Sequence, residues 1–233
     1  MAGGLGTRLQ SVLVGKPKVL AEVKGRPFLS YLLDEIHDAD YRRVVLCVGY
    51  KAQQVRQKFG ENYKSLELNY SQESSPLGTG GALRLASSLV NSKRVLVLNG
   101  DSFCQVNLCA FEKWHVAKKS QVSIVLTHVP NVKRFGRVQI SKDEMVLAFE
   151  EKTNESTPGL INAGVYLVNK SLITTIPEHK PISLEKDIFP KWIQRGICGY
   201  EAGGKFIDIG TPESFVSAEE FFGNCSSENK GKL

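Results

Sequence analysis

The chain has few of the features that mark membrane, secreted or disulfide-stabilised proteins. It contains no uninterrupted apolar run close to the roughly 20 residues that a transmembrane helix needs. No basic segment followed by an apolar stretch opens the sequence, so a secretory signal is not expected. The 5 cysteines are scattered and have no CxxC spacing, which argues against a disulfide framework and a structural zinc site. We therefore expect a cytoplasmic protein with free thiols.

The sequence also lacks internal repeats and any recognisable nucleic-acid-binding module. Its net charge of +6 comes from dispersed residues, and the densest basic cluster, at residues 113–119, is typical of a solvated helix face. We interpret this charge as suited to anionic small molecules. Neither nucleic acid nor a membrane is expected as a partner.

What is present suits one globular domain. A chain of 233 residues, 42% of them hydrophobic, can bury a sizeable core. We expect residues 1–222 to form this domain. Residues 223–233 are polar and rich in Ser, Asn and Lys, which predicts a disordered tail.

Hydrophobic periodicity alternates between helical and strand spacing. It predicts helices at residues 27–39, 51–59, 80–89, 183–195 and 211–222, and strands at 43–49, 66–70, 94–98, 122–129, 137–140, 145–149 and 161–168. Alternating strands and helices favour an α/β fold of three layers, Rossmann-like, with a mainly parallel sheet.

The strongest motif opens the chain. Residues 2–9 read AGGLGTRL, and Lys16-Pro17-Lys18 follows. Glycines let several backbone N–H groups approach one phosphate, and the guanidinium of Arg8 suits a bidentate phosphate contact. Lys18 can bring an ammonium to the same anion. On its own, a glycine-rich loop is equally compatible with a tight turn before a helix.

Two carboxylates follow predicted strands. Asp101 comes directly after the buried strand at 94–98, at the sheet edge where open α/β folds bind ligands. Asp208 lies within FIDIGTP, just before a helix, where an Asp alone is more often a cap or turn residue. Paired carboxylates suit Mg²⁺, which prefers oxygen ligands.

These motifs together resemble the signature of sugar-phosphate nucleotidyltransferases, a glycine loop followed by a Pro-Lys-Pro stretch. This chain has Lys16-Pro17-Lys18-Val19 where a second proline is usual, with the lysine spacing kept. The resemblance covers nearly the whole chain. It implies a nucleotide-binding half at about residues 1–120 and a sugar-binding half at about 121–222. It implies catalytic roles for Arg8, Lys18 and Asp101, and a Mg²⁺ held by Asp101 and Asp208.

The same resemblance implies the substrate contacts. The nucleotide would lie on the glycine loop and on the PLGTGGAL stretch at residues 76–83, with contacts from Gly3, Gly4, Gly6, Thr7, Glu73, Gly78 and Thr79. The sugar phosphate would be held by short motifs of the second half, FGRV, FEEK and GLINAGVY, through Gly136, Glu151, Lys152 and Asn162. Each short motif also has an ordinary structural reading, and their order and co-occurrence carry the inference.

The implied reaction joins a nucleoside monophosphate to a sugar 1-phosphate and releases pyrophosphate. The combined motifs most resemble the subgroup that uses GTP and D-glycero-D-manno-heptose 1-phosphate, although UTP, CTP or dTTP with another sugar stays open. Two further alternatives are a non-catalytic nucleotide-sugar sensor and an inactive fragment or interaction domain. The partners expected are the NTP and the sugar 1-phosphate, and the resemblance is compatible with a homo-oligomer.

One feature departs from the family pattern. The family has a buried strand that runs into the glycine loop, whereas Met1 here stands directly before Ala2. We expect the sheet to lack this central strand and to expose two unpaired strand edges. A start upstream of Met1 would supply about five apolar residues at this place.

Overall fold

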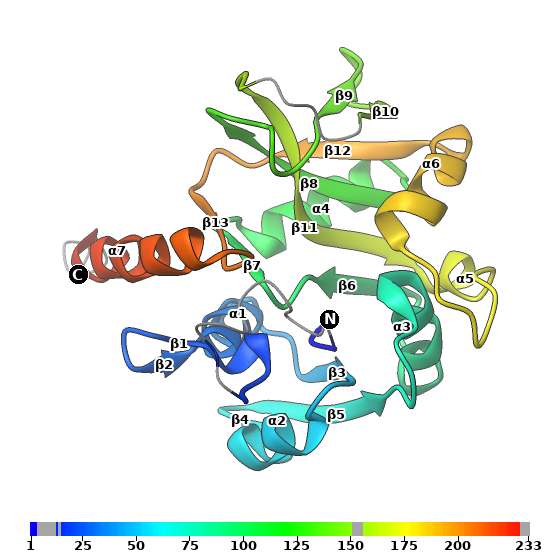
Figure 1. Ribbon diagram of the computed structural model, residues 1–233. Helices are drawn as coiled ribbons and strands as arrows, with labels where there is room; N and C mark the ends of the chain where they lie inside the picture. The colour runs from blue at the N-terminus through cyan, green and yellow to red at the C-terminus, as the bar shows by residue number, and fades with distance from the viewer. Residues whose placement is uncertain (4–12, 14, 151–155, 229–233) are drawn as a thin grey trace.

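Strands and helices alternate through the first half of the chain, as the hydrophobic pattern predicts (Figure 1). The computed structural model describes residues 1–3, 13, 15–150 and 156–228. Its first half contains the 3₁₀ turn η2 (Lys18–Leu20), β1 (Glu22–Val23), β2 (Arg26–Pro27), α1 (Phe28–Asp38), β3 (Arg43–Val48), α2 (Ala52–Phe59), β4 (Asn62–Tyr63), β5 (Leu66–Gln72), α3 (Gly78–Ala86), η3 (Ser87–Leu89), β6 (Arg94–Leu98), β7 (Ser102–Cys104) and α4 (Leu108–Ala117).

Strands dominate the second half. It contains β8 (Val122–Val129), β9 (Val138–Ile140), β10 (Val146–Phe149), β11 (Gly159–Asn169), α5 (Lys170–Ile173), the π turn η4 (Leu184–Ile188), α6 (Phe189–Trp192), the 3₁₀ turn η5 (Ile193–Arg195), β12 (Ile197–Glu201), β13 (Phe206–Asp208) and α7 (Pro212–Glu228). The helix expected at 183–195 is therefore wrong as a single element. Pro190 has no backbone N–H to donate, and the segment winds as three short turns.

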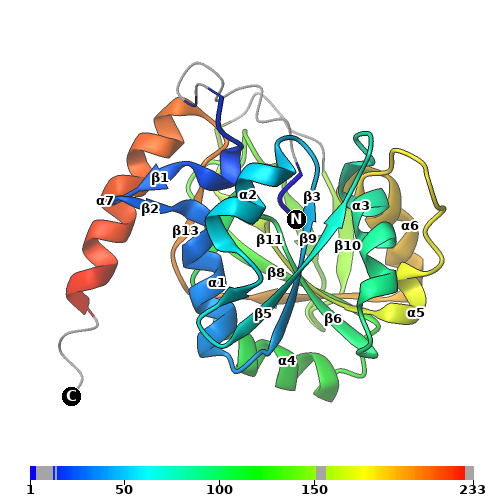
Figure 2. The same cartoon turned by 90° about the horizontal axis from the view of Figure 1, so that it is seen from below.

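Helices form where apolar side chains recur at helical spacing. In α1 the buried residues include Leu29, Leu32, Leu33 and Ile36, which line one face. Figure 2 shows α1 on one side of the central strands and α3 on the other. This layered α/β arrangement is the fold class that the sequence predicts. No helix in the described part of the chain is both long and apolar enough to cross a bilayer.

The strands form sheets with both parallel and antiparallel pairs, rather than the mainly parallel sheet that the sequence predicts. β3 pairs with β5 and β8 pairs with β12 in parallel, whereas β11 runs antiparallel to both β6 and β8. The chain leaves β8, forms the β9–β10 hairpin and re-enters as β11, so it returns in the opposite direction. The expectation of a mainly parallel sheet fails here because β8 and β11 are joined by a hairpin rather than by a crossover helix.

A gap separates the two main groups of strands, β4-β5-β3 and β6-β11-β8-β12. Met1 and Ala2 lie at one end of it (Figure 1), where the N–H of Ala2 donates to Cys47 O at 2.8 Å and that of Gly100 donates to Met1 O at 2.8 Å. Beyond them, no strand in the described residues pairs with the facing edges of β3 and β6. A cavity of about 400 Å³ lies there, lined by both strands, α1 and α3. The expected pair of open strand edges is present.

The last helix differs from expectation. α7 begins at Pro212 with the Thr211 hydroxyl accepting from the N–H of Ser214, as its sequence predicts, but it continues to Glu228. The structure therefore includes residues 223–228 in a helix, whereas residues 229–233 of the predicted tail lie outside the described residues. The helix is anchored before this segment because the Phe222 ring stacks on Tyr31 at 3.8 Å and packs edge-on against Phe103 at 5.1 Å. The composition of residues 223–233 shows only that they are polar. It does not show that a helix anchored by packing before residue 223 continues into them.

Candidate active site

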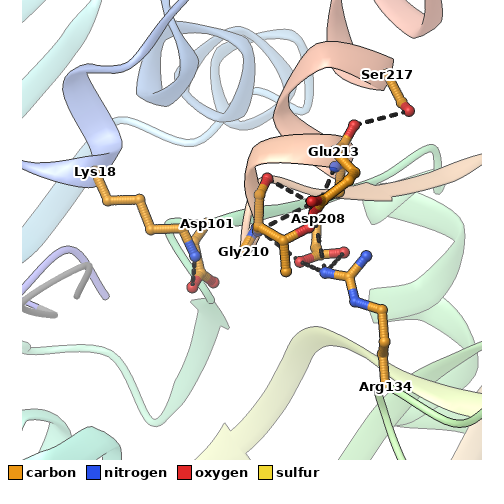
Figure 3. Close-up of polar contacts among 9 residues, drawn as sticks. Lys18, Asp101, Arg134, Asp208, Gly210, Glu213 and Ser217 are labelled. Atoms are coloured by element: carbon orange, nitrogen blue, oxygen red, sulfur yellow. Dashed lines mark hydrogen bonds and ion pairs between the residues drawn. The ribbon is translucent and has the colours of Figure 1, made fainter. Parts of the chain in front are cut away.

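Backbone pairing brings the two predicted metal-binding carboxylates together. Asp208 ends β13, which pairs antiparallel with β7 so that Asp208 lies opposite Ser102. The N–H of Ile209 donates to the backbone carbonyl of Asp101 at 2.9 Å. Asp101 itself follows β6 in the turn leading to β7. Figure 3 shows both side chains in the same part of the molecule, although they are 107 residues apart in the printed sequence.

Lys18 contacts Asp101 directly. Its ammonium lies 2.8 Å from Oδ2 of that carboxylate, and its side chain is only 14% exposed against 49% for Asp101. The 3₁₀ turn η2 fixes the lysine because its neighbours Val19 and Leu20 are buried in the core. The structure therefore joins two of the three residues for which the sequence predicts catalytic roles.

Arg134 holds the second carboxylate, and sequence reasoning did not identify it. One guanidinium nitrogen lies 2.8 Å from Oδ2 and 3.0 Å from Oδ1 of Asp208, whose Oδ2 also accepts from the N–H of Gly210 at 2.7 Å (Figure 3). Arg134 directly precedes the FGRV motif, so its position next to a predicted sugar-binding motif could have marked it as a site residue. Each carboxylate is thus neutralised by one cationic side chain.

These residues fit a hard divalent cation with an incomplete protein ligand set. Asp101 and Asp208 offer carboxylate oxygens, the donors such ions prefer. The described residues contain no group of three or more His, Cys, Asp or Glu side chains able to enclose a metal. Two carboxylates leave coordination positions for water or substrate phosphates, the usual arrangement for Mg²⁺.

Two of the residues predicted to contact the nucleotide, Gly3 and Glu73, lie close together. Glu73 is half-buried, and its Oε2 accepts from the N–H of Leu77 at 3.0 Å. A Cβ on Gly3 would come within 2.8 Å of Glu73 Oε1, so the start of the glycine loop and the Glu73 side chain are neighbours. Their contact with a nucleotide stays a prediction.

Gly78 and Thr79 begin α3, and some of the free N–H groups at the start of this helix are already bonded to another segment of the chain. The carbonyl of Ile182 accepts from the N–H groups of Gly80 and Gly81 at 2.8 and 3.2 Å. The Thr79 hydroxyl donates to Glu185 Oε2 at 2.7 Å. A segment of the second half therefore seals the start of the predicted nucleotide loop.

On the sugar side, Asn162 lies at an irregularity in β11. The pairing of β11 with β8 shifts register between Asn162 and Tyr166, and Gly164 takes a φ of +78° inside this bulge. A Cβ on Gly164 would meet Ser102 Oγ at 2.7 Å, so the bulge lies against the strand that follows Asp101. Asn162, two residues before Gly164, is thereby placed near the turn that carries Asp101. Gly136 is buried in the turn before β9, where its N–H donates to Val132 O at 3.0 Å.

The remaining predicted residues, Gly4, Gly6, Thr7, Arg8, Glu151 and Lys152, lie outside the described residues. Their roles stay predictions.

Beneath Asn162 lies a polar group that the motifs did not single out. The Tyr166 hydroxyl is fully buried and receives N–H donors from Asn162 at 3.0 Å and Asn99 at 3.4 Å. Burial, followed by the nearby Glu185 carboxylate, raises the pKa of Tyr166 well above its ordinary value. The hydroxyl therefore keeps its proton at neutral pH. Tyr166 stands inside the GLINAGVY motif, but its apolar strand context conceals a polar role.

Known proteins share this sequence and architecture. The chain is 34% identical over 221 residues to the D-glycero-alpha-D-manno-heptose 1-phosphate guanylyltransferase of Aneurinibacillus thermoaerophilus, covering 94% of this chain and 95% of that protein. It is 33% identical to the mannose-1-phosphate guanylyltransferase of Mycobacterium tuberculosis, of which it spans 61%. HddC from Yersinia pseudotuberculosis, solved in complex with GMP-PN, superposes with a TM-score of 0.84 at 34% identity, covering 95% of this chain and 96% of that one.

Residues 1–224 match the nucleotidyl transferase family as a whole. Because the family match spans residues 1–224, and because the chain covers 95% of the heptose 1-phosphate guanylyltransferase and 96% of HddC, the chain belongs to the nucleotidyl transferase family and is a sugar 1-phosphate nucleotidyltransferase.

Proposed function

We propose that this enzyme transfers GMP from GTP to D-glycero-D-manno-heptose 1-phosphate and releases pyrophosphate. The observation that carries the proposal is the 34% identity to a heptose 1-phosphate guanylyltransferase over 94% of this chain and 95% of that protein. A second relative of that name, from Campylobacter jejuni, is 30% identical over 217 residues. We further propose that the enzyme acts in the cytoplasm, and self-association stays a prediction.

The chemistry requires positioning rather than a covalent nucleophile. The sugar phosphate oxygen attacks the α-phosphorus of the nucleotide, and pyrophosphate leaves in line. Two polyanions that repel each other must be held together while charge develops on the leaving group. Lys18, largely shielded from solvent beside Asp101, would meet the α-phosphate, and Asn162 would contact the sugar. Lys152 would bind the sugar phosphate.

Nucleotidyltransferases generally use a divalent metal ion, and we propose Mg²⁺ held by Asp101 and Asp208. When bound, it would supply Lewis-acid neutralisation of phosphate charge. The ammonium of Lys18, 2.8 Å from Asp101, and the guanidinium of Arg134, 2.8 Å from Asp208, supply positive charge to the same carboxylates. Both side chains would turn from carboxylate to phosphate as substrates enter.

Arg8 carries a separate prediction. Its guanidinium is proposed to stabilise the leaving pyrophosphate, so Arg8→Ala is expected to lower turnover by about 100-fold or more while the protein stays folded. Steady-state pyrophosphate release together with circular dichroism checks this. Near-normal turnover in the variant would remove Arg8 from the mechanism.

A second candidate substrate is mannose 1-phosphate, because the Mycobacterium tuberculosis relative of that specificity is 33% identical over 220 residues. The test measures pyrophosphate release with Mg²⁺, pairing each of GTP, UTP, CTP, ATP and dTTP with the heptose, mannose and glucose 1-phosphates. Highest kcat/KM for GTP with the heptose supports the proposal. Preference for mannose 1-phosphate selects the second candidate, and a preferred base other than guanine contradicts both.

A further inference from the structure

Glu185 joins the two halves of the site by direct contacts. It lies in the π turn η4, and its Oε2 accepts from the hydroxyls of Thr79 at 2.7 Å and Ser183 at 2.9 Å. Its Oε1 accepts from the Tyr166 hydroxyl at 3.3 Å. Thr79 belongs to the nucleotide loop, whereas Tyr166 lies under the sugar-side bulge. One carboxylate therefore touches elements that are expected to bind different substrates.

The direction of these hydrogen bonds is fixed by chemistry. A carboxylate only accepts, so the Tyr166 hydroxyl must donate to Glu185 and accept from the Asn162 and Asn99 amides. The raised pKa of Tyr166 keeps the proton that this donation needs. Removing the carboxylate would free the hydroxyl to reorient, and the amides above it would lose a defined acceptor.

These hydrogen bonds fix the orientation of the Asn162 side-chain amide. Its Oδ1 accepts from the N–H of Gly164 at 2.9 Å, and one hydrogen of Nδ2 goes to Tyr166. The second Nδ2 hydrogen has no other partner among the described contacts and is available to an acceptor on a ligand. Asn162 is thereby oriented as a hydrogen-bond donor, suited to a sugar hydroxyl oxygen.

The other end of the chain of bonds sets the start of α3. Thr79 Oγ1 accepts from the N–H of Leu184 at 2.8 Å while it donates to Glu185. The same segment caps α3 through the Ile182 carbonyl. The nucleotide loop is thus positioned by the turn that carries Glu185.

We propose that Glu185 is a positioning residue that orients Asn162, through Tyr166, for the sugar 1-phosphate and holds the nucleotide loop through Thr79. The proposal rests on the proposed function of the site. Glu185 need not touch either substrate, because its effect travels through two hydroxyl groups. Its loss should therefore weaken both substrates, whereas loss of either hydroxyl should weaken one.

The experiment compares variants by KM, kcat and melting temperature. Glu185→Gln is expected to raise KM for the sugar phosphate about tenfold and KM for the nucleotide several-fold, since a net hydrogen bond contributes on this scale. Tyr166→Phe should raise only the sugar phosphate KM. In a Thr79→Val background, Glu185→Gln should still raise the sugar phosphate KM but add little to the nucleotide KM.

Asp187→Asn is the matched control. Asp187 lies in the same turn, and its carboxylate accepts from the N–H of Ser183 at 2.7 Å without reaching Thr79 or Tyr166. If it raises both KM values as Glu185→Gln does, the effect comes from a loosened turn and the proposal is wrong. Lack of pyrophosphate release by the wild-type enzyme contradicts the proposed function instead. Wild-type turnover with unchanged KM values in Glu185→Gln contradicts only the role of Glu185.

Discussion

At the scale of single residues, each of the two site carboxylates is paired with one positively charged side chain. Asp101 pairs with Lys18, and Asp208 pairs with Arg134. Removing either carboxylate alone would leave its cationic partner facing the proposed metal position without a compensating negative charge. The two carboxylates nevertheless differ in their surroundings, because Asp208 is also tied to the Gly210 backbone and Asp101 is half-exposed.

Asp101→Asn tests the role of this carboxylate in catalysis. The amide keeps the size of the side chain but removes the charge, so pyrophosphate release is expected to fall about 100-fold or more. Because the ion pair with Lys18 is partly exposed, the free energy of unfolding should change by less than about 1 kcal/mol. Parallel turnover and urea-denaturation measurements check both. A large loss of stability would assign Asp101 a structural role.

Arg134→Gln tests whether the Arg134 guanidinium competes with a metal ion for the Asp208 carboxylate. The guanidinium now occupies Asp208, so its removal should tighten binding of a divalent ion by a few-fold. Titration with Mn²⁺, followed by electron paramagnetic resonance without substrates, measures this affinity. Arg134→Lys, which keeps the charge, serves as the control and should bind as the wild type does. Weaker Mn²⁺ binding in the glutamine variant would contradict the competition.

At the scale of elements, the gap between β3 and β6 leaves identifiable backbone groups without ladder partners. Asn99 donates to Gly164 O, so the alternation of an antiparallel ladder turns the N–H groups of Leu96 and Leu98 away from β11 and into the gap. On the β3 side of the gap, the N–H of Glu73 donates to Val48 O, so Val48 faces β5. Because residues of a strand alternate in direction, the N–H groups of Val45 and Cys47 point away from β5 and into the gap. Apolar side chains of α1 and α3 also line the cavity between these strands.

An added strand should therefore stabilise the fold. Met1 accepts from Gly100 and its amine donates to Leu98 O, which is the pattern of a parallel ladder with β6. We expect a Val/Ile-rich extension of about five residues before Met1 to raise the free energy of unfolding by several kcal/mol. It would also turn the Met1 amine, whose pKa is lowered by burial, into an uncharged amide. Denaturant melts measure the change.

A Gly/Ser extension of equal length is the control for this prediction. Only the apolar extension should slow hydrogen exchange at the amides of Val45, Cys47, Leu96 and Leu98. Equal protection and equal stability with both extensions would show that the cavity does not accept a strand.

The whole molecule is tied together by packing between distant segments. α7 returns from the end of the described chain to stack Phe222 on Tyr31 of α1, while α4 packs His115 against β8. His115 is buried, its Nδ1 lies 2.7 Å from Ser123 Oγ, and its Nε2 has no partner in the described residues. Burial, followed by the charge of Arg94, lowers the pKa of His115.

This histidine makes global stability depend on pH. A pKa lowered in the folded state means that protons bind the unfolded chain more readily. The stabilisation from neutral His115 is therefore complete above about pH 6.5 and is lost as pH falls through and below that value. His115→Asn should flatten this slope in urea melts between about pH 5 and pH 7. An unchanged slope in His115→Asn would contradict the assignment.

The sequence by itself determined the local elements and the identity of the chemical groups. Helix α1 and strands β3, β6 and β8 follow from the spacing of apolar residues. The position after the strand at 94–98 and the FIDIGTP motif point to Asp101 and Asp208. These features are recoverable because each depends on neighbours along the chain. The two open strand edges were predicted from the family resemblance instead.

Only the tertiary structure decided which distant groups meet. Arg134 reaches Asp208 across 74 residues, and Glu185 reaches Thr79 across 106. The direction of β11, the three turns at 184–195 and the length of α7 likewise depend on what each segment packs against. The physical reason is that hydrogen bonds and ion pairs between remote residues leave no periodic trace in the sequence.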